Sequence, residues 1–109
     1  MAAFAAVLHD RFVRTAVQHV RVCFPEDAEE LGARGVEALV GEVLQRAAGH
    51  GFEIGEDLLR YLNLAVMLGA AFDCAPEFPW AARTLKNRSL DAGEKLAAME
   101  SEVDRLFGD

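Results

Sequence analysis

The 109-residue chain has the size of one domain, residues 1–109, and is long enough to close a core of its own. Its apolar fraction of 52% argues against disorder. Eighteen acidic residues against eleven lysines and arginines give a net charge of -7, which repels phosphate backbones and anionic lipids. We therefore expect no nucleic acid and no membrane among its partners. The charge suits a basic protein partner, and solubility alone explains it equally well.

The first residues, MAAFAAVLHDRF, lack the basic segment that precedes the apolar part of a signal peptide. The longest apolar run, between Arg60 and Asp73, contains a polar residue and a glycine, and it falls short of the ~20 residues that span a bilayer. Cys23 and Cys74 lie far apart in the sequence and form no CxxC pair. These features favour free thiols and a cytoplasmic location.

Residues 4–23 predict an amphipathic helix, because charged and apolar residues separate onto opposite sides at helical spacing. The helix should end at Phe24, since the residue before a proline avoids the α region. Pro25 then opens a second helical segment that has acidic residues in its first turn. We expect Gly32 and Gly35 to break or bend this segment.

Apolar residues repeat at 3–4 spacing over residues 36–47, and Gly49 or Gly51 is a natural C-terminal cap for that helix. Residues 56–72 are apolar almost all round, which is typical of a helix covered by its neighbours. We therefore predict that a helix at roughly 57–69 is central and the most buried.

Two more helices are predicted after the central one. Pro79 suits the first turn of a short helix, and Asp91 with Glu94 three residues later forms the pattern of a capping box for a final helix through Phe107. No alternating strand pattern or internal repeat is visible in the sequence. The predicted fold class is all-α, a compact bundle of about five helices with a central buried helix.

The three histidines do not form a recognisable metal or catalytic pattern. His9 and His19 both fall on the apolar side of the first helix, and ten residues of helix put them roughly 15 Å apart, too far to share an ion. His50 lies at a helix end, where a cation meets the helix dipole favourably. A nucleophile made of Cys74 with His9 or His50 has no accompanying signature of an orienting group or an oxyanion hole. We expect structural roles for these histidines, with no catalytic residue, cofactor or metal.

Asn63 and the stretch FDCAPEFPWA (72–81) stand out from the helical background. Asn63 is the lone polar side chain in an apolar helix, so we expect it to bond a neighbouring backbone or to face a partner groove. In the stretch 72–81, Asp73 is expected to cap a turn, while Pro76 and Pro79 fix the path of the chain. Aromatic residues beside these prolines would be buried inward or under a partner.

The segment LLRYLNLAVMLGAAFDCAPEFPWAARTL (58–85) resembles small helical bacterial proteins that are encoded beside type VI secretion spike and effector genes. In that family an apolar, Tyr-containing helix leads through Gly and Phe-Asp to a Pro-x-x-Pro-Trp-Ala step and a short helix. The positions that match are Tyr61, Gly69, Phe72, Asp73, Pro76, Pro79, Trp80 and Ala81. VRVCFPEDAEELG is similar too, in placing an aromatic-Pro-acid step before a helix. The resemblance implies a small non-enzymatic adaptor or co-chaperone, and it supplies no catalytic residues.

These observations predict an accessory protein that binds a secreted effector or spike protein of a contractile secretion system. The first alternative is an immunity protein that inhibits a cognate toxin, and a lower one is a small-molecule-binding helical domain or enzyme. Leu96, Met99, Val103 and Leu106 form a 3–4–3 seam on the last helix, which would either close the bundle or face a partner, including a second copy. The residues proposed to bind protein are Phe78, Trp80, Leu96, Met99, Val103 and Leu106.

Overall fold

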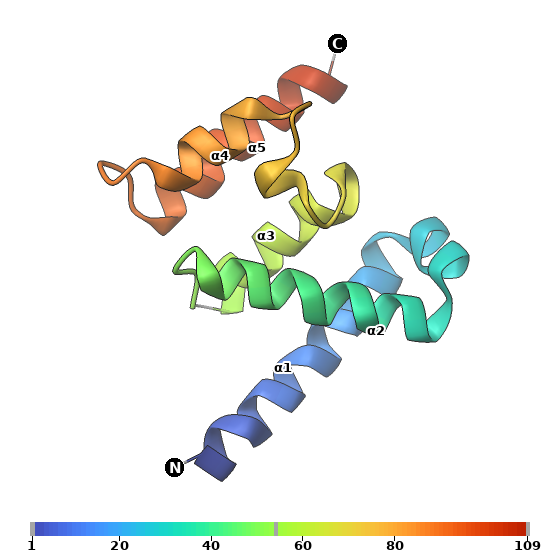
Figure 1. Cartoon of the computed structure of the whole chain (residues 1–109). Coiled ribbons are helices and arrows are strands. Elements are labelled where there is room, and N and C mark those ends of the chain that lie inside the picture. Colours follow the sequence, from blue (N-terminus) through green and yellow to red (C-terminus); the bar gives the residue numbers. More distant parts are fainter. Residues whose placement is uncertain (1, 54, 109) are drawn as a thin grey trace.

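In the described part of the chain, five α-helices and one short 3-10 turn follow one another (Figure 1). Their bounds are α1 (Ala2–Cys23), α2 (Pro25–Gly49), α3 (Gly55–Leu68), η1 (Phe72–Cys74), α4 (Pro79–Lys86) and α5 (Ala92–Phe107). The computed structural model describes the backbone of residues 2–53 and 55–108, and the side chains of residues 11–53 and 55–108. These residues contain no strand, which confirms the predicted all-α bundle.

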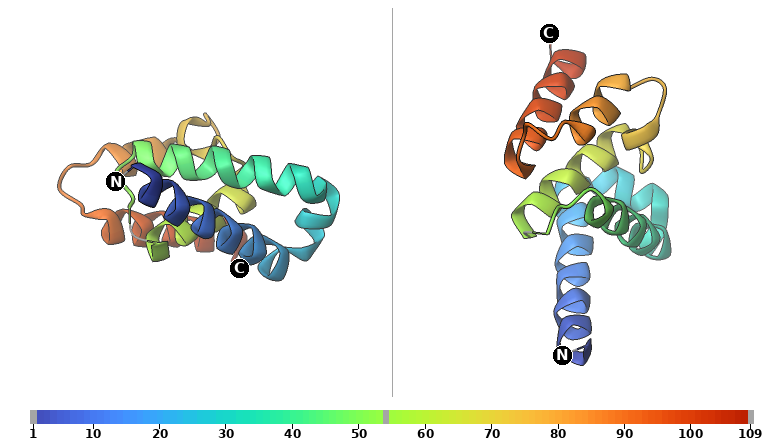
Figure 2. Two further views of the ribbon diagram at one scale, coloured as in Figure 1. Left: turned by 90° about the horizontal axis from the view of Figure 1, so that it is seen from below. Right: turned by 60° about the vertical axis from the view of Figure 1, so that its left-hand side comes forward.

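The first two helices lie side by side as a hairpin (Figure 2). Phe24 alone separates them, and Pro25 occupies the first turn of α2, as predicted. α1 buries Ala16 and Val20. α2 buries residues at the predicted 3–4 spacing, namely Val36, Val40, Val43, Leu44 and Ala47. The apolar sides of both helices therefore join one core.

Gly32 interrupts α2 with φ 74° and ψ 170°, a conformation that L side chains rarely adopt. Of the two glycines expected to break this segment, Gly32 is therefore the one that does. Gly35 has no such positive φ. A Cβ atom at Gly35 would lie 3.0 Å from the Cβ atom of Leu31, so this glycine leaves room for a neighbouring side chain.

A Schellman motif ends α2, as the glycines there predicted. Gly51 has φ 90°. Its N–H donates to the carbonyl of Ala48 at 3.0 Å, and the N–H of Phe52 donates to the carbonyl of Ala47 at 3.1 Å. Phe52 and Ala47 are both buried in the core. The motif satisfies the last carbonyls of α2 and sets His50 at the point where the chain turns towards α3.

α3 is the central helix and packs against α1, α2, α5 and η1. It buries Tyr61, Leu62, Leu64 and Ala65. Met67, at 45% exposed, shows that the helix is not covered on every side, although its sequence is apolar almost all round.

The last two helices form a second hairpin, α4 and α5, which packs on α3 through α5. Pro79 begins α4, and Asp91 and Glu94 form the predicted capping box at the start of α5. The ammonium group of Lys95 donates to the carbonyl of Leu85 at 2.9 Å and ties the two helices together. Arg60 of α3 donates to both carboxylate oxygens of Glu100 of α5, at 3.0 and 2.6 Å.

The molecule measures 38 × 35 × 20 Å, so it is about two helices thick in its shortest direction. α1 extends away from α4 and α5, and the two ends of the chain point in opposite directions (Figures 1 and 2). Within the described residues, neither α1 nor α2 packs its backbone against α4, α5 or η1. The two hairpins are therefore connected through α3 and through side chains.

Candidate functional site

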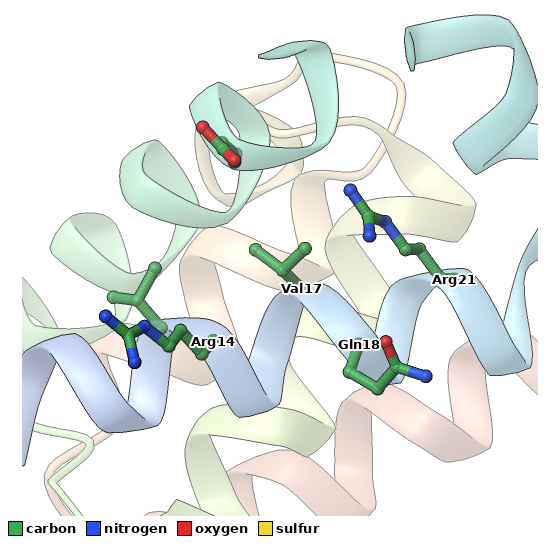
Figure 3. A pocket seen from close by; sticks show the side chains of 6 residues that line it. Arg14, Val17, Gln18 and Arg21 are labelled. Carbon is green, nitrogen blue, oxygen red and sulfur yellow. The ribbon is translucent and has the colours of Figure 1, made fainter. Parts of the chain in front are cut away.

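A groove of about 350 Å³ lies between α1 and α2 (Figure 3). Its lining combines apolar, basic and amide side chains of α1 with one acidic side chain of α2, and consists of Val13, Arg14, Val17, Gln18, Arg21 and Glu37. Arg14, Val17 and Arg21 recur at three- and four-residue spacing and rise from the same side of α1, with Val17 between the two arginines. The groove thus has an apolar floor flanked by positive charge.

Two basic side chains and one acidic side chain share this groove. Arg14 and Arg21 are exposed, and neither forms an ion pair with a carboxylate whose side chain is described. An exposed guanidinium can bind a carboxylate with two parallel hydrogen bonds. On a chain with a net charge of -7, this groove brings two arginines together beside apolar side chains, with Glu37 also in its lining.

A second hollow, of about 420 Å³, lies where the first turns of α2 approach the end of α3. Its lining is mainly apolar with two carboxylates, and consists of Asp27, Glu30, Leu31, Leu39, Ala65, Val66, Gly69 and Ala70. Leu31 is 43% exposed here, a large apolar side chain that lies beside negative charge. The charged side chains of this hollow are acidic, whereas two of the three in the α1–α2 groove are basic.

The residues predicted to bind protein divide into two groups. Leu96, Met99 and Val103 are buried in the core, so three members of the α5 seam pack on the chain's own helices and offer no exposed surface. Leu106, the fourth member, is 51% exposed, because it lies in the last helical turn beyond the edge of the core.

Phe78 and Trp80 are half-buried and lie together, with ring centroids 5.8 Å apart. Trp80 also lines a shallow hollow of about 290 Å³ with Arg83, Thr84, Asn87 and Glu102. This position agrees with the expected packing of the two aromatic residues beside Pro79. Part of each ring remains exposed, and a role in partner contact stays a prediction for Phe78, Trp80 and Leu106.

The sequence context of Asp73 suggested that it caps a turn. Its side chain instead binds the end of α2. Its side chain is 7% exposed; it accepts a hydrogen bond from Arg46 at 2.9 Å and one from His50 Nε2 at 2.9 Å. The expectation was wrong because the donors lie more than twenty residues earlier in the chain. Burial alone would raise the pKa of the Asp73 carboxyl, but the His50 hydrogen bond and the Arg46 charge outweigh it and lower the pKa.

Tyr61 lies behind this carboxylate in a row of aromatic rings. Its ring centroid is 5.4 Å from that of Phe52, 5.0 Å from that of Phe72 and 6.1 Å from that of His50. Burial raises the pKa of the Tyr61 phenol, and the negative charge of Asp73 adds to the effect. Its hydroxyl oxygen is buried without a hydrogen-bond partner of acceptable geometry in the described part of the chain. The cluster of Arg46, His50, Tyr61 and Asp73 is thus a structural tie, with an acid held in its charged form.

Asn63 binds a side chain of α1 rather than a backbone group. Its Oδ1 atom lies 2.6 Å from Nε2 of His19, and Nδ1 of the same ring lies 3.7 Å from Sγ of Cys23. Sequence reasoning missed this connection, although His19 and Asn63 are both polar residues on otherwise apolar helix sides. Two such residues on helices that pack together are a signal for a buried polar pair.

The remaining predicted chemistry receives little support from geometry. His50 bonds Asp73, and Cys74 is exposed and donates to the carbonyl of Ala71 at 3.5 Å, so the pairing of Cys74 with His50 does not form. The side chain of His9 lies outside the described residues. In the part of the chain that is described, no three His, Cys, Asp or Glu side chains gather as ligands for a metal, and no helix is both long and apolar enough to cross a bilayer.

Comparison with known proteins leaves the chain without a family assignment. No protein-family model, no curated protein and no solved structure matches it.

Proposed function

We propose that this chain is a non-enzymatic accessory protein that binds another protein in the α1–α2 groove. The observation that carries the proposal is the pairing of the apolar floor at Val17 with the exposed guanidinium groups of Arg14 and Arg21. An amphipathic helix of a partner would place an apolar side chain on the floor and an acidic one, three or four residues away, against an arginine. The exposed Leu106 and the half-buried Phe78 and Trp80 provide further apolar area in the second half of the chain.

The resemblance of residues 58–85 to small proteins encoded beside type VI secretion genes supports a secretion-system setting. In that setting the partner is a secreted effector or a spike protein, and the chain acts as its adaptor or co-chaperone in the cytoplasm. An adaptor of this kind needs a surface for its client and no reacting groups.

An immunity protein that inhibits a toxin is the second candidate. The hollow lined by Asp27, Glu30 and the exposed Leu31 favours it, because carboxylates beside an apolar side chain suit a basic toxin. The net charge of -7 acts in the same direction by speeding the approach of a cationic partner.

Purification of the tagged chain from its native host, followed by mass spectrometry, separates the two candidates. We expect an effector or spike protein for the adaptor. A toxin domain that the chain neutralises in a growth assay would support immunity, and the absence of a protein partner would count against both.

Charge reversal tests the groove itself. The variant R14E/R21E should lose at least ~10-fold in affinity for the recovered partner, because two carboxylate pairs become repulsive. The matched control is Arg88→Glu, an exposed arginine in the loop before α5, paired with Lys86→Glu to equalise the charge change. Equal losses from both double variants would show a general charge effect and would contradict binding in the groove.

A further inference from the structure

The side chains of Cys23, His19 and Asn63 form a hydrogen-bonded series that joins α1 to α3. Cys23 Sγ lies 3.7 Å from His19 Nδ1, and His19 Nε2 lies 2.6 Å from Asn63 Oδ1. Cys23 and His19 are four residues apart on α1, so they share one side of the helix. Asn63 comes from the central helix, 44 residues after His19.

The Asn63 contact determines which nitrogen of the neutral His19 ring carries the proton. A carbonyl oxygen only accepts hydrogen bonds, so Nε2 carries the hydrogen and donates to Oδ1 of Asn63. Nδ1 then keeps a free lone pair, and it is this atom that faces the sulfur of Cys23. A nucleophile, a base within reach and a third group that orients the base are the parts of an activated thiol.

A reactive thiol must be accessible while the groups that activate it are held in place, and the exposure of these three side chains fits that description. Cys23 is exposed and open to a reagent, while His19 and Asn63 are half-buried and fixed between two packed helices. Cys74 is also exposed, but its sulfur contacts the carbonyl of Ala71, and no imidazole among the described side chains bonds it. Of the two accessible thiols, Cys23 is therefore the one that has a base beside it among the described side chains.

We propose that Cys23 is a nucleophilic thiol that exchanges with low-molecular-weight disulfides and becomes a mixed disulfide. The Cys23 proton passes to Nδ1 of His19 as the sulfur attacks one sulfur of the disulfide. A bond forms between Cys23 and that sulfur, the original S–S bond breaks, and its electron pair leaves with the second sulfur. The departing thiolate takes the proton from His19, so the reaction consumes one disulfide and releases one thiol.

Two single-thiol proteins test the proposal, Cys74→Ser, which keeps Cys23, and Cys23→Ser, which keeps Cys74. Each full chain is mixed with excess 4,4′-dithiodipyridine, a neutral disulfide whose released thiopyridone is followed by absorbance. At neutral pH we expect Cys23 to react at least ~10-fold faster than Cys74, as base assistance at the reacting atom allows. In denaturant, where the His19 contact is gone, the two rates should agree within ~3-fold.

Substitution of the base and of the orienting residue separates activation from simple access. His19→Gln should bring the Cys23 rate to within ~3-fold of the Cys74 rate, and Asn63→Ala should lower it by a smaller factor. His19→Gln in the Cys23→Ser protein serves as the matched control and should leave the Cys74 rate unchanged. The proposal is overturned if folded Cys23 reacts no faster than Cys74, or if a folded His19→Gln protein keeps the full rate. The comparison of folded with denatured protein tests the proposal even if a variant does not fold.

Discussion

Asp73 of η1 accepts a hydrogen bond from Arg46 of α2, and this side-chain contact spans two elements whose backbones do not pack together. The carboxylate is buried and His50 donates to its second oxygen. We expect Asp73→Ala to lower the free energy of unfolding by ~2–4 kcal/mol, because two charge-assisted hydrogen bonds are lost while their donors stay partly covered. Urea unfolding followed by circular dichroism measures the change. A loss below ~1 kcal/mol would show that the contact contributes no more than an ordinary turn cap.

Acid should weaken the contacts of Asp73 with Arg46 and His50. The pKa of Asp73 is lowered in the folded chain, so the folded state binds fewer protons than the unfolded state as pH falls. The stabilisation by the charged Asp73 carboxylate is complete above the ordinary carboxyl pKa of ~3.9. It is lost as pH falls below that value towards the pKa of Asp73 in the folded chain. We expect the free energy of unfolding, measured at several pH values between ~7 and ~3, to fall less for Asp73→Asn than for the unchanged chain. Parallel curves would contradict this assignment.

Tyr61→Phe is expected to keep or raise stability at neutral pH. The hydroxyl is buried without a hydrogen-bond partner of acceptable geometry among the described residues, and such a group costs ~1–3 kcal/mol. The pKa of the Tyr61 phenol is raised in the folded chain, so the unfolded chain loses this proton first as pH rises. Ionisation of Tyr61 therefore leaves the free energy of unfolding unchanged below the unfolded pKa of ~10 and lowers it as pH rises from there through the folded pKa. The variant should therefore resist alkaline unfolding better than the unchanged chain. A fall of more than ~1 kcal/mol at neutral pH would indicate that the hydroxyl does form a bond.

Two glycines of α2 should respond in opposite ways to alanine. Gly32 has φ 74° and ψ 170°, so Gly32→Ala should cost ~1–3 kcal/mol through backbone strain, although a Cβ atom there meets nothing within 4 Å. Gly41 is helical and equally open, so Gly41→Ala should stabilise by ~0.5–1 kcal/mol. Melting temperatures of the two variants supply the comparison, and a shift in the same direction would rule out a strained break at Gly32.

The α5 seam offers a pair of variants that distinguishes core from surface. Val103→Glu places a charge among buried side chains and should destabilise by ~3 kcal/mol or more. Leu106→Glu, on the same helix at an exposed position, should change stability by less than ~0.5 kcal/mol. If Leu106 contacts a partner or a second copy, that variant folds normally and loses the contact. Size-exclusion chromatography and binding to the recovered partner measure this.

The helices could be predicted from the sequence because their signals are local. Pro25 and Pro79 mark two helix starts, Asp91 with Glu94 marks a third, and Gly32 marks the break in α2. The seam of α5 is ambiguous in the sequence for a physical reason, since an apolar stripe has the same spacing whether it meets its own core or another protein. Only the packing against α3 and α4 places Leu96, Met99 and Val103 inside.

The polar contacts of Asp73 and Asn63 could not be predicted because each one joins residues that are distant in sequence. Asp73 lies in a stretch rich in proline, where a turn cap is the usual role of an aspartate, and nothing nearby points to Arg46. Asn63 is recognisable as a buried polar residue, but the sequence does not specify its partner. The α1–α2 groove escapes sequence reasoning for a related reason, since Arg14 and Arg21 look like an ordinary solvated helix side until α2 lies beside them.

The order in which the helices pack affects how the chain emerges from a ribosome. α1 pairs with α2 and α2 with α3, so the first half has its partners once Leu68 is available. Contacts between neighbours along a chain close quickly, within ~1 ms for helical bundles, whereas synthesis adds only ~5–20 residues per second. The side of α3 that α5 covers therefore stays bare from the emergence of α3 until residues 92–107 have also left the ribosome. During that interval the nascent chain presents an apolar surface that the finished protein conceals.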